Sequence, residues 1–324
     1  MSTQPSDDIS DAPRPGPKRL RRWVCRILKV VIVTLAIVQV FNIAMRLKAD
    51  AEARKIADTE YGQAFESADY IGDGDAGVLL FHGLHGTPRN FQAIMTSLEE
   101  RGIHYYAPML GGYRVGPAAG LSFDARRFAA DAERAYKLLS KRCKRIVVAG
   151  HSFGSLQATD VASRYPVAGL VVVSPAYRIT QRWYLPPSLE AWVKSLSPVM
   201  PLLPKFSPAR MNDPSGLENY SGFMTFSLQS VSALIDYSDA VLARADKVQA
   251  PVLGLITTGD EVIDIPSARA GVKSLGSTEK RIVGYTRSNH MILLDYDRRD
   301  ANEKVLSFID NRLDNMPQPS LNER

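Results

Sequence analysis

The chain has 324 residues, 45% hydrophobic and 23% charged, a composition typical of a globular protein rather than a disordered or fibrous one. Its net charge of +6 is concentrated near the N-terminus, because residues 1–29 carry seven Arg or Lys and only three Asp. The remainder has no basic stripe with interleaved aromatic residues, so nucleic acid is not an expected partner, and two cysteines, Cys25 and Cys143, exclude a disulfide framework.

The N-terminal sixty residues are predicted to form three segments that are distinct from the rest. Residues 1–22 are polar, proline-rich and basic, which indicates a disordered tail. Residues 23–46 are predicted to be a transmembrane anchor around the uncharged run 30–45, with flanking Arg and Lys side chains that reach the headgroups. Residues 47–60 resemble a short helical stalk.

A cleaved signal peptide and a buried core helix are the alternatives to an anchor. A core helix is disfavoured beside an Arg-rich tail, and a signal peptide needs small residues at a cleavage site, which "VFNIAM" does not offer and Ala49-Asp50-Ala51 offers only late. More positive charge precedes the apolar run than follows it. We therefore expect a single-pass protein with its N-terminus in the cytoplasm and its main domain on the periplasmic or extracellular side.

From Gly77 onward, strands alternate with helices. Continuous apolar runs predict six strands, at 77–81, 103–108, 145–150, 169–174, 251–257 and 280–285. Helices are expected at about 90–101, from a Ser122 cap to 140, at 157–164 and at 298–313. This pattern is typical of an α/β fold with a mostly parallel sheet covered by helices on both faces.

One α/β domain is expected over residues 61–314, followed by a tail at 315–324. Within it the alternation stops at residues 176–246, a proline-rich insert that we interpret as a helical cap over the strand ends. The cap is rich in large apolar side chains, which are expected either to line a pocket or to seal the cap onto the core. They are Trp183, Tyr184, Leu185, Trp192, Leu202, Leu203, Phe206, Phe223, Met224 and Phe226.

The stretch "VVAGHSFGSLQA" (147–158) places Ser152 between two glycines at the end of a buried strand. Gly-x-Ser-x-Gly between a strand and a helix is the nucleophile-elbow pattern, in which a strained turn exposes the hydroxyl at a helix N-terminus. An ordinary strand-to-helix turn is the alternative, and the strand and helix on either side make it the weaker interpretation. Ser152 is therefore the predicted nucleophile.

A serine needs a base, and the chain has five histidines. They are His82, His85, His104, His151 and His290. The last lies in "RSNHMILLD", after the final strand, from where its imidazole can reach the strand end that carries the serine. The histidine beside the serine points elsewhere from a sharp turn, so we expect it to be structural.

The acid of a triad should follow a preceding strand, and "GLITTGDEVID" supplies Asp260 there. Glu261 and Asp264 are rivals, but the Gly259-Asp260 turn lies nearest the strand end. Along the chain, the triad residues come in the order Ser152, Asp260, His290, which is the order expected for a fold that carries a nucleophile elbow. Two backbone N–H groups are needed for the oxyanion.

The expected oxyanion donors are the N–H groups of Phe153, directly after the nucleophile, and of Leu84 in the turn "FHGLHGTP" (81–88). His82 is expected to pin this turn rather than to act in catalysis.

The motifs "LLFHGLHGTP", "GHSFGS", "TGDEVIDIPSA" and "SNHMILLD", in this order and spacing, resemble the α/β-hydrolases, in particular the bacterial carboxylesterase and monoacylglycerol lipase (serine aminopeptidase-like) branch. The resemblance covers roughly residues 76–313. It implies an α/β-hydrolase fold, a Ser152–His290–Asp260 triad, oxyanion donors at Leu84 and Phe153, and a cap that shapes the acyl pocket.

The function expected from this resemblance and from the anchor is a membrane-bound serine hydrolase. It would cleave carboxylic esters with an apolar acyl chain, such as monoacylglycerol or lysophospholipid, through an acyl-enzyme and without a metal or organic cofactor. An acyltransferase with the same triad, a peptidase and a non-catalytic binding protein are the alternatives. The sequence predicts neither the natural substrate nor the oligomeric state.

Overall fold

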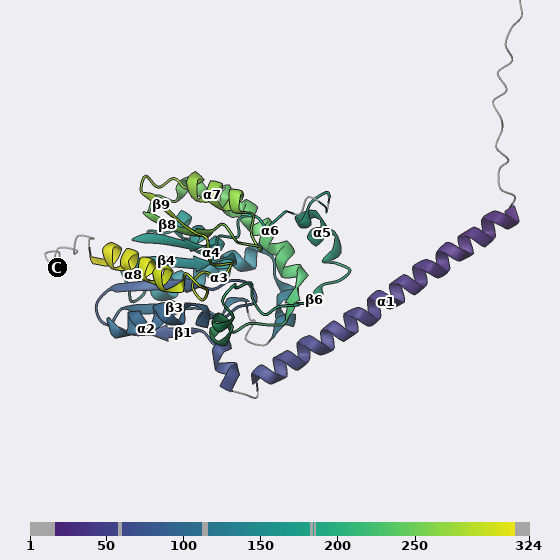
Figure 1. Ribbon diagram of the computed structural model, residues 1–324, viewed down its shortest axis with the longest axis horizontal. Helices are drawn as coiled ribbons and strands as arrows, with labels where there is room; N and C mark the ends of the chain where they lie inside the picture. The colour runs from purple at the N-terminus through teal and green to yellow at the C-terminus, as the bar shows by residue number, and fades with distance from the viewer. Residues whose placement is uncertain (1–16, 58–59, 112–115, 182–183, 185, 315–324) are drawn as a thin grey trace, which may run out of the picture. The chain divides into compact units, whose positions relative to one another are not determined.

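The computed structural model describes residues 17–57, 60–111, 116–181, 184 and 186–314 (Figure 1). The expected tail at 315–324 and most of the expected N-terminal tail lie outside these residues. The chain divides into two compact units, Met1–Ala44 and Met45–Arg324, and each is described by itself.

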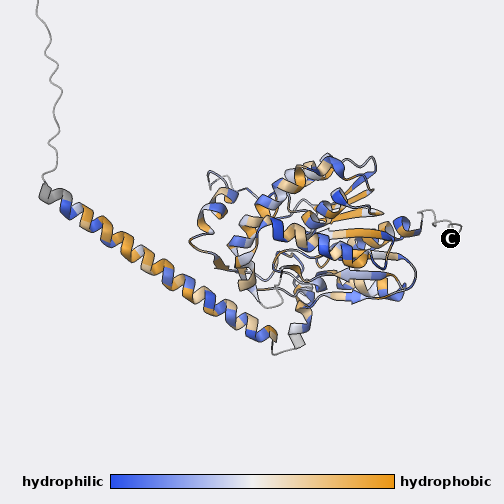
Figure 2. Ribbon diagram, turned by 180° about the vertical axis from the view of Figure 1, so that it is seen from behind, coloured by the Kyte–Doolittle hydropathy of each residue, from blue (hydrophilic) through white to orange (hydrophobic). Residues whose placement is uncertain are grey.

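The N-terminal helix α1 runs from Pro17 to Ala57. It therefore begins inside the segment expected to be disordered, at a proline, which is tolerated in the first helical turn because its missing N–H would have no partner there. Apolar residues dominate much of its length in Figure 2. The part Arg21–Ala57 is long and apolar enough to cross a membrane, with a mean hydropathy of 2.3 over its most apolar stretch.

The segment expected to be a stalk is a continuation of the same helix, and the second unit buries one side of it. Ala49 is fully buried and Ile56 is 5% exposed. A short 3₁₀ helix, η1 (Glu60–Phe65), follows and buries Phe65. The last turns of α1 are thus part of the folded α/β unit and not a free connection, because their small and apolar residues face its core.

The central sheet has seven strands in the order β1-β3-β2-β4-β5-β8-β9, all parallel except for the antiparallel pair of β1 and β3. The strands are β1 (Ala68–Tyr70), β2 (Ala76–Phe81), β3 (His104–Ala107), β4 (Arg145–His151), β5 (Gly169–Val173), β8 (Val252–Thr257) and β9 (Lys280–Tyr285). The six expected strands are present. Strand β1 was not predicted, because its three residues "ADY" carry no apolar run.

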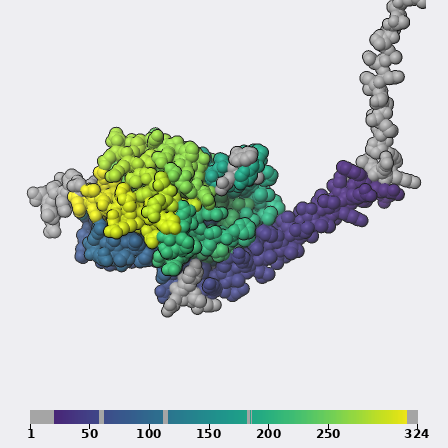
Figure 3. Space-filling view, viewed as in Figure 1, coloured from purple at the N-terminus to yellow at the C-terminus, as the bar shows by residue number. Residues whose placement is uncertain are grey.

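Successive side chains of each strand enter opposite cores, as the two-residue period of a strand requires. In β2, Val78 and Leu80 pack in one core and Leu79 and Phe81 in the other. The first core is covered by α2 (Gln92–Glu100) and α8 (Arg298–Asp314), and the second by α3 (Ala125–Leu139), α4 (Phe153–Arg164) and α7 (Ile265–Ser274). In Figure 3 the surfaces of α8, in yellow, and of α7, in yellow-green, flank the edge strand β9.

Helix α3 begins later than expected. Its cap is Asp124, whose Oδ1 accepts a hydrogen bond from the backbone N–H of Arg127 at 2.7 Å. Ser122 instead ends a 3₁₀ helix, η4 (Pro117–Ser122). An aspartate two residues on competes for the same role, and its carboxylate makes a charge-assisted bond that a serine hydroxyl cannot.

The chain leaves the sheet between β5 and β8 and forms the insert. Its elements are α5 (Leu189–Leu196), β6 (Leu202–Pro204), η5 (Pro214–Asn219), β7 (Thr225–Ser227), α6 (Leu228–Leu242) and η6 (Ala245–Lys247). Strands β6 and β7 form an antiparallel pair that the sequence did not predict, since prolines interrupt its apolar pattern. Helix α6 packs through Tyr237 on Phe128 and Phe153 of the main core.

Candidate active site

Ser152 occupies a strained turn between strand β4 and helix α4. Its φ of 54° and ψ of −119° lie outside the regions that ordinary residues favour. The flanking glycines are required by space: a Cβ at Gly150 would lie 2.2 Å from the carbonyl oxygen of Gly154, and one at Gly154 would lie 1.9 Å from that of Phe81. The turn therefore has the geometry of a nucleophile elbow.

The structure brings Ser152, His290 and Asp260 together at the carboxyl ends of parallel strands. The Nε2 atom of His290 lies 2.8 Å from Ser152 Oγ, and its Nδ1 atom lies 2.8 Å from Asp260 Oδ2. Since the carboxylate only accepts, Nδ1 carries a proton and donates, which leaves Nε2 free to accept from the serine hydroxyl. This is the arrangement of a nucleophile, a base and an orienting acid.

Asp260 is held as a carboxylate. Burial by itself would raise the pKa of its carboxyl, but the charge of His290, the bond to its imidazole and two backbone bonds outweigh burial and lower it. Those backbone bonds come from the N–H groups of Val262, at 2.8 Å, and Ile263, at 3.1 Å, and both end on Oδ1. The other oxygen, Oδ2, is therefore left for the imidazole.

The two rival acids lie elsewhere. Glu261 is about half exposed and its carboxylate is 3.6 Å from the guanidinium of Arg210. Asp264 caps helix α7, with its Oδ1 accepting from the N–H of Ser267 at 2.9 Å. Asp260 is the one of the three whose carboxylate bonds to the imidazole of His290.

Two side chains that the sequence did not assign to the site hold the backbone of His290. Its carbonyl oxygen accepts from His151 Nε2 at 3.1 Å and from Ser174 Oγ at 2.9 Å. Burial lowers the pKa of His151 to about 3, so this ring stays neutral. His151 is structural, as expected, but it supports the base directly. Ser174, with a φ of 43°, carries no sequence signal that separates it from other serines.

A fully buried carboxylate, that of Asp295, fixes the loop that carries His290. Its two oxygens accept from the backbone N–H groups of Asn289, Tyr296, Asn212 and Asp213 at 2.7 to 2.8 Å. The first two belong to the histidine loop and the last two to the insert. Asp295 thus joins the cap to the loop of the base, and sequence alone did not distinguish it from an exposed acid.

The loop 82–86 lies against the nucleophile. A Cβ at Gly83 would be 3.1 Å from the Cβ of Ser152, which is a tight contact, so the loop packs closely on the nucleophile at this glycine. Leu84 follows in this loop, while Phe153 begins helix α4 directly after the serine. Both expected oxyanion donors therefore belong to segments that border Ser152, and their assignment as donors remains a prediction.

His82 fixes the start of this loop. Its Nε2 accepts from the N–H of Leu110 at 3.1 Å, so the proton is on Nδ1, which donates to the carbonyl of Gly83 at 2.8 Å. Burial lowers the pKa of His82 to about 4, with the bond to Gly83 opposing this in part. The neutral ring bridges two loops through these two bonds.

The large apolar side chains of the cap do not form one set. Phe223 is 2% exposed and packs on Phe65 with ring centroids 4.7 Å apart. Phe206, in contrast, is 96% exposed, and Tyr184 and Trp192 also face solvent. Trp183 and Leu185 lie outside the described residues. Some of the cap residues therefore seal it onto the core, and others remain on its surface.

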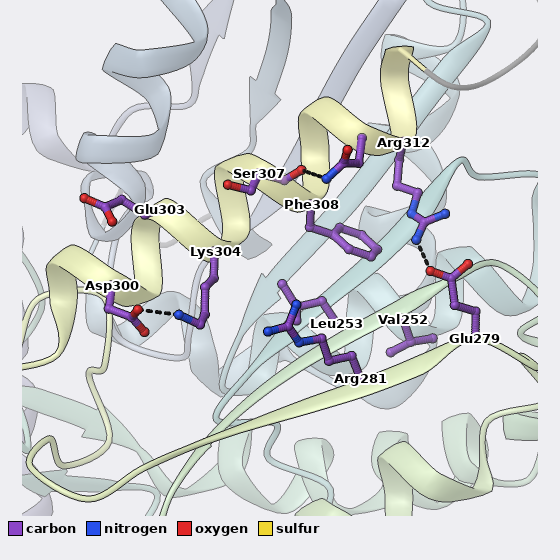
Figure 4. Close-up of a pocket in the computed structure, with 11 residues that line it drawn as sticks. Val252, Leu253, Glu279, Arg281, Asp300, Glu303, Lys304, Ser307, Phe308 and Arg312 are labelled. Carbon is purple, nitrogen blue, oxygen red and sulfur yellow. Dashed lines mark hydrogen bonds and ion pairs between the residues drawn. The ribbon is translucent and has the colours of Figure 1, made fainter.

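A surface cavity of about 560 Å³ lies between β8, β9 and α8, at the amino ends of the two strands (Figure 4). Its charges are matched, because Arg312 pairs with Glu279 and Lys304 with Asp300. It lies at the opposite strand ends from Ser152. Among the described residues, no group of three or more His, Cys, Asp or Glu is arranged to bind a metal ion.

Comparison with known proteins gives a matching family and a similar enzyme. The family described as "Serine aminopeptidase, S33" matches residues 72–297. A thermostable monoacylglycerol lipase of Bacillus sp. (strain H-257) is 27% identical over 240 residues, which are 74% of this chain and 92% of the relative.

Solved structures share the fold at lower identity. A structure of the metagenome-derived lipolytic enzymes LipS and LipT superposes with a TM-score of 0.69 at 22% identity, covering 76% of this chain and 98% of that one. Monoacylglycerol lipase of Paleococcus ferrophilus superposes with a TM-score of 0.61 at 19% identity, with the same coverage of 76% and 98%. The expected fold is thereby confirmed.

Proposed function

The chain belongs to the serine aminopeptidase S33 family and is a serine hydrolase of the α/β-hydrolase fold; we propose that it cleaves carboxylic esters with an apolar acyl chain through an acyl-enzyme. The observation that carries the proposal is the continuous hydrogen-bonded path from Asp260 through His290 to Ser152, with both bonds at 2.8 Å. The similar proteins include monoacylglycerol lipases and a lipolytic enzyme, which supports esters as the class of substrate.

In the proposed mechanism, Ser152 Oγ attacks the ester carbonyl carbon while His290 Nε2 takes the hydroxyl proton. Asp260 holds the imidazole in the tautomer that can accept it. The N–H groups of Leu84 and Phe153 stabilise the oxyanion of the tetrahedral intermediate. The ester C–O bond then breaks, and the imidazolium returns its proton to the leaving alcohol. Water repeats the same steps on the acyl-enzyme and releases the acid.

We also propose that helix α1 is an uncleaved anchor, with the N-terminus in the cytoplasm and residues 61–314 on the other side of the membrane. Its length and mean hydropathy of 2.3 support a span. The charge asymmetry around the apolar run supports the orientation. An anchored enzyme would meet substrates dispersed in the bilayer, such as monoacylglycerol or lysophospholipid, at a high effective concentration.

The test is an activity screen on the full-length protein in detergent. We expect hydrolysis of p-nitrophenyl and glycerol esters, with release of free fatty acid, and labelling of Ser152 by a fluorophosphonate. Transfer of the acyl group to an added alcohol in preference to water would make the protein an acyltransferase. Hydrolysis of peptides alone would make it a peptidase. Failure of the fluorophosphonate to react would exclude a working serine hydrolase.

A further inference from the structure

The last turns of helix α1 hold a strand of the cap through one carboxylate. Glu52 Oε2 accepts from the backbone N–H groups of Met224, at 3.0 Å, and Thr225, at 3.2 Å. Its Oε1 accepts from the hydroxyl of Thr225 at 2.6 Å, and Thr225 is fully buried. Three bonds to a charged acceptor are stronger than three bonds between neutral groups. Glu52 therefore fixes the first residues of strand β7.

The residues that precede this strand are paired with the loop beside the nucleophile. The N–H of Phe223 donates to the carbonyl of His85 at 3.0 Å, and Gly222 forms an antiparallel bridge with Gly86. These contacts directly follow Leu84 in the chain. A shift of residues 222–225 would therefore be transmitted to the segment that carries a proposed oxyanion donor.

The loop has little freedom of its own to absorb such a shift. His85 has a φ of 64°, a left-handed conformation that costs energy for a residue with a Cβ and persists only where its surroundings impose it. Gly83 lies close against Ser152, since a Cβ there would be 3.1 Å from the Cβ of the serine. The pairing with Gly222 and Phe223 is one of the contacts that impose this shape.

Other contacts hold the two partners, the end of helix α1 and the residues around Met224, in place. A Cβ at Gly116 would lie 2.6 Å from the Cβ of Ala53, so helix and loop approach each other closely there. The N–H of Lys205 donates to the carbonyl of Met224 at 2.7 Å, which secures that residue from its other side. The ammonium of Lys205 bonds to Pro208 and Tyr220 and attracts the Glu52 carboxylate. Residues 45–57 precede the region 72–297 that the family matches, so the brace that Glu52 forms on strand β7 lies outside the matched region.

We infer that Glu52 is a positioning residue for the reaction: by holding strand β7 it holds the loop 83–86 in the shape in which Leu84 faces the oxyanion. The inference deepens the proposed function and rests on it. It assigns the end of α1 a part in catalysis that is separate from any part in anchoring. The brace acts through Thr225, Phe223 and His85 and not by contact with the substrate.

The variants to compare are Glu52→Gln and Glu52→Ala, in the full-length protein in detergent. Glutamine places an amide N–H₂ where one of the two accepting oxygens was, so it opposes at least one of the three donors. The matched control is Asp50→Asn in the same helical segment, because Asp50 is half exposed and pairs at 3.8 Å with Arg46, which is also exposed. Thr225→Val removes one of the three bonds at nearly constant volume and serves if the Glu52 variants fold poorly.

The kinetic readout is kcat for a water-soluble p-nitrophenyl ester, divided by the number of active sites titrated with a fluorophosphonate. A purely structural role would reduce the number of titrated sites or the Tm and leave kcat per site unchanged. We expect the Glu52 variants to lose roughly tenfold or more in kcat per site with KM within about twofold, since loss of an oxyanion donor lowers kcat by about 10² to 10³. The kcat per site of Asp50→Asn should match that of the wild type, and the kcat per site of Thr225→Val should be about threefold lower.

A second readout does not depend on ester hydrolysis. Hydrogen exchange of residues 82–86, followed by mass spectrometry, should speed up in Glu52→Gln and stay unchanged in Asp50→Asn. Unchanged exchange together with unchanged kcat per site would overturn the inference. If the wild-type protein cleaves no ester but exchange of residues 82–86 is still faster in Glu52→Gln than in the wild type, the proposed function is overturned and Glu52 remains the brace of this loop.

Discussion

The imidazole of His151 donates from Nε2 to the backbone carbonyl of His290 at 3.1 Å, so the residue before the candidate nucleophile holds the loop of the candidate base. Ser174 donates to the same carbonyl at 2.9 Å. The two segments are far apart in the chain, and their coupling keeps the distance from Ser152 to His290 fixed. This arrangement has consequences for activity that can be measured separately from the triad itself.

Removing the nucleophile should remove the chemistry. We expect Ser152→Ala to lower kcat for ester hydrolysis by roughly 10⁴-fold or more, because the remaining groups bind substrate but form no acyl-enzyme. The thermal midpoint should change little, since the change removes the hydrogen bond between the hydroxyl and His290 and leaves the packing of the core in place. The measurement is steady-state hydrolysis of a p-nitrophenyl ester by purified protein. Near-normal activity in this variant would refute the mechanism.

The acid should be Asp260 and neither of its neighbours. Asp260→Asn should lower kcat by roughly 10⁴-fold, because an amide can donate to Nδ1 and so stabilise the wrong imidazole tautomer. Glu261→Gln and Asp264→Asn should each leave kcat within about twofold, and Asp264→Asn should also change stability little, because asparagine caps a helix about as well as aspartate does. Kinetics and thermal unfolding of the three variants separate these effects. Greater sensitivity at Asp264 would shift the assignment to helix α7.

Loss of the support for His290 should impair catalysis without impairing binding. His151→Ala removes one of the two donors to the His290 carbonyl, so we expect kcat to fall roughly tenfold while KM stays within about twofold. The fall should be larger in the double variant with Ser174→Ala, which removes both donors. An equal fall in binding and in kcat would indicate a general loss of folding instead. Active-site titration of each preparation distinguishes the two cases.

The sequence was sufficient for the fold because short apolar runs such as "GVLLF" and "RIVVAG" alternate with helical segments, which favours buried strands. The strand and helix on either side of Gly-His-Ser-Phe-Gly favour a nucleophile elbow over an ordinary turn. It was also sufficient to select Asp260 and His290 as the partners that the structure places at bonding distance from one another and from Ser152. These residues follow strand ends, and parallel strands end at one edge of a sheet.

What the sequence did not reveal depends on contacts between distant segments. Asp295 bonds four backbone N–H groups from two parts of the chain, and nothing in "MILLDYD" separates it from an exposed acid. Strand β7 is three residues long and is defined by its partners, β6 and Glu52. Such features arise from packing and have no local pattern of their own.

Acid should destabilise the protein partly through His82, one of its buried neutral histidines. Its pKa falls from 6.5 to about 4 in the fold because burial disfavours the charged ring. Below about pH 6.5 His82 is therefore protonated in the unfolded chain, whereas in the folded chain it is protonated only below about pH 4. The free energy of unfolding consequently decreases as the pH falls from about 6.5 to about 4, by up to about 3 kcal/mol.

In His82→Gln the side-chain carbonyl can accept from Leu110 in place of Nε2, but it does not titrate. The variant should be less stable than the wild type at neutral pH and should lose less on acidification. Urea unfolding of both proteins across this pH range measures the difference. Parallel curves for the two proteins would show that His82 is not the source of the acid sensitivity.

The final prediction separates the anchor from the brace. A protein that begins at Met45 keeps Ala49, Glu52 and Ile56 in place and lacks the apolar run, so it should be released from membranes without detergent. It should hydrolyse a water-soluble ester at the full-length rate, because every proposed catalytic group lies beyond residue 80. On a substrate dispersed in vesicles its activity should fall below that of the full-length protein, since it no longer has the high effective substrate concentration that an anchor provides.

A protein that begins at Gly62 is the control, because it lacks both the apolar run and Glu52 and should lose kcat per active site on the soluble ester as well. The full-length protein should resist extraction by high salt or carbonate, and externally added protease should reach residues 61–314 but not the N-terminal tail. A mature N-terminus at or after Ala44 would instead identify a cleaved signal peptide. Such a result would disprove the anchor but not the non-cytoplasmic location of residues 61–314, because a signal peptide also directs export. The brace would survive it if cleavage takes place before Glu52.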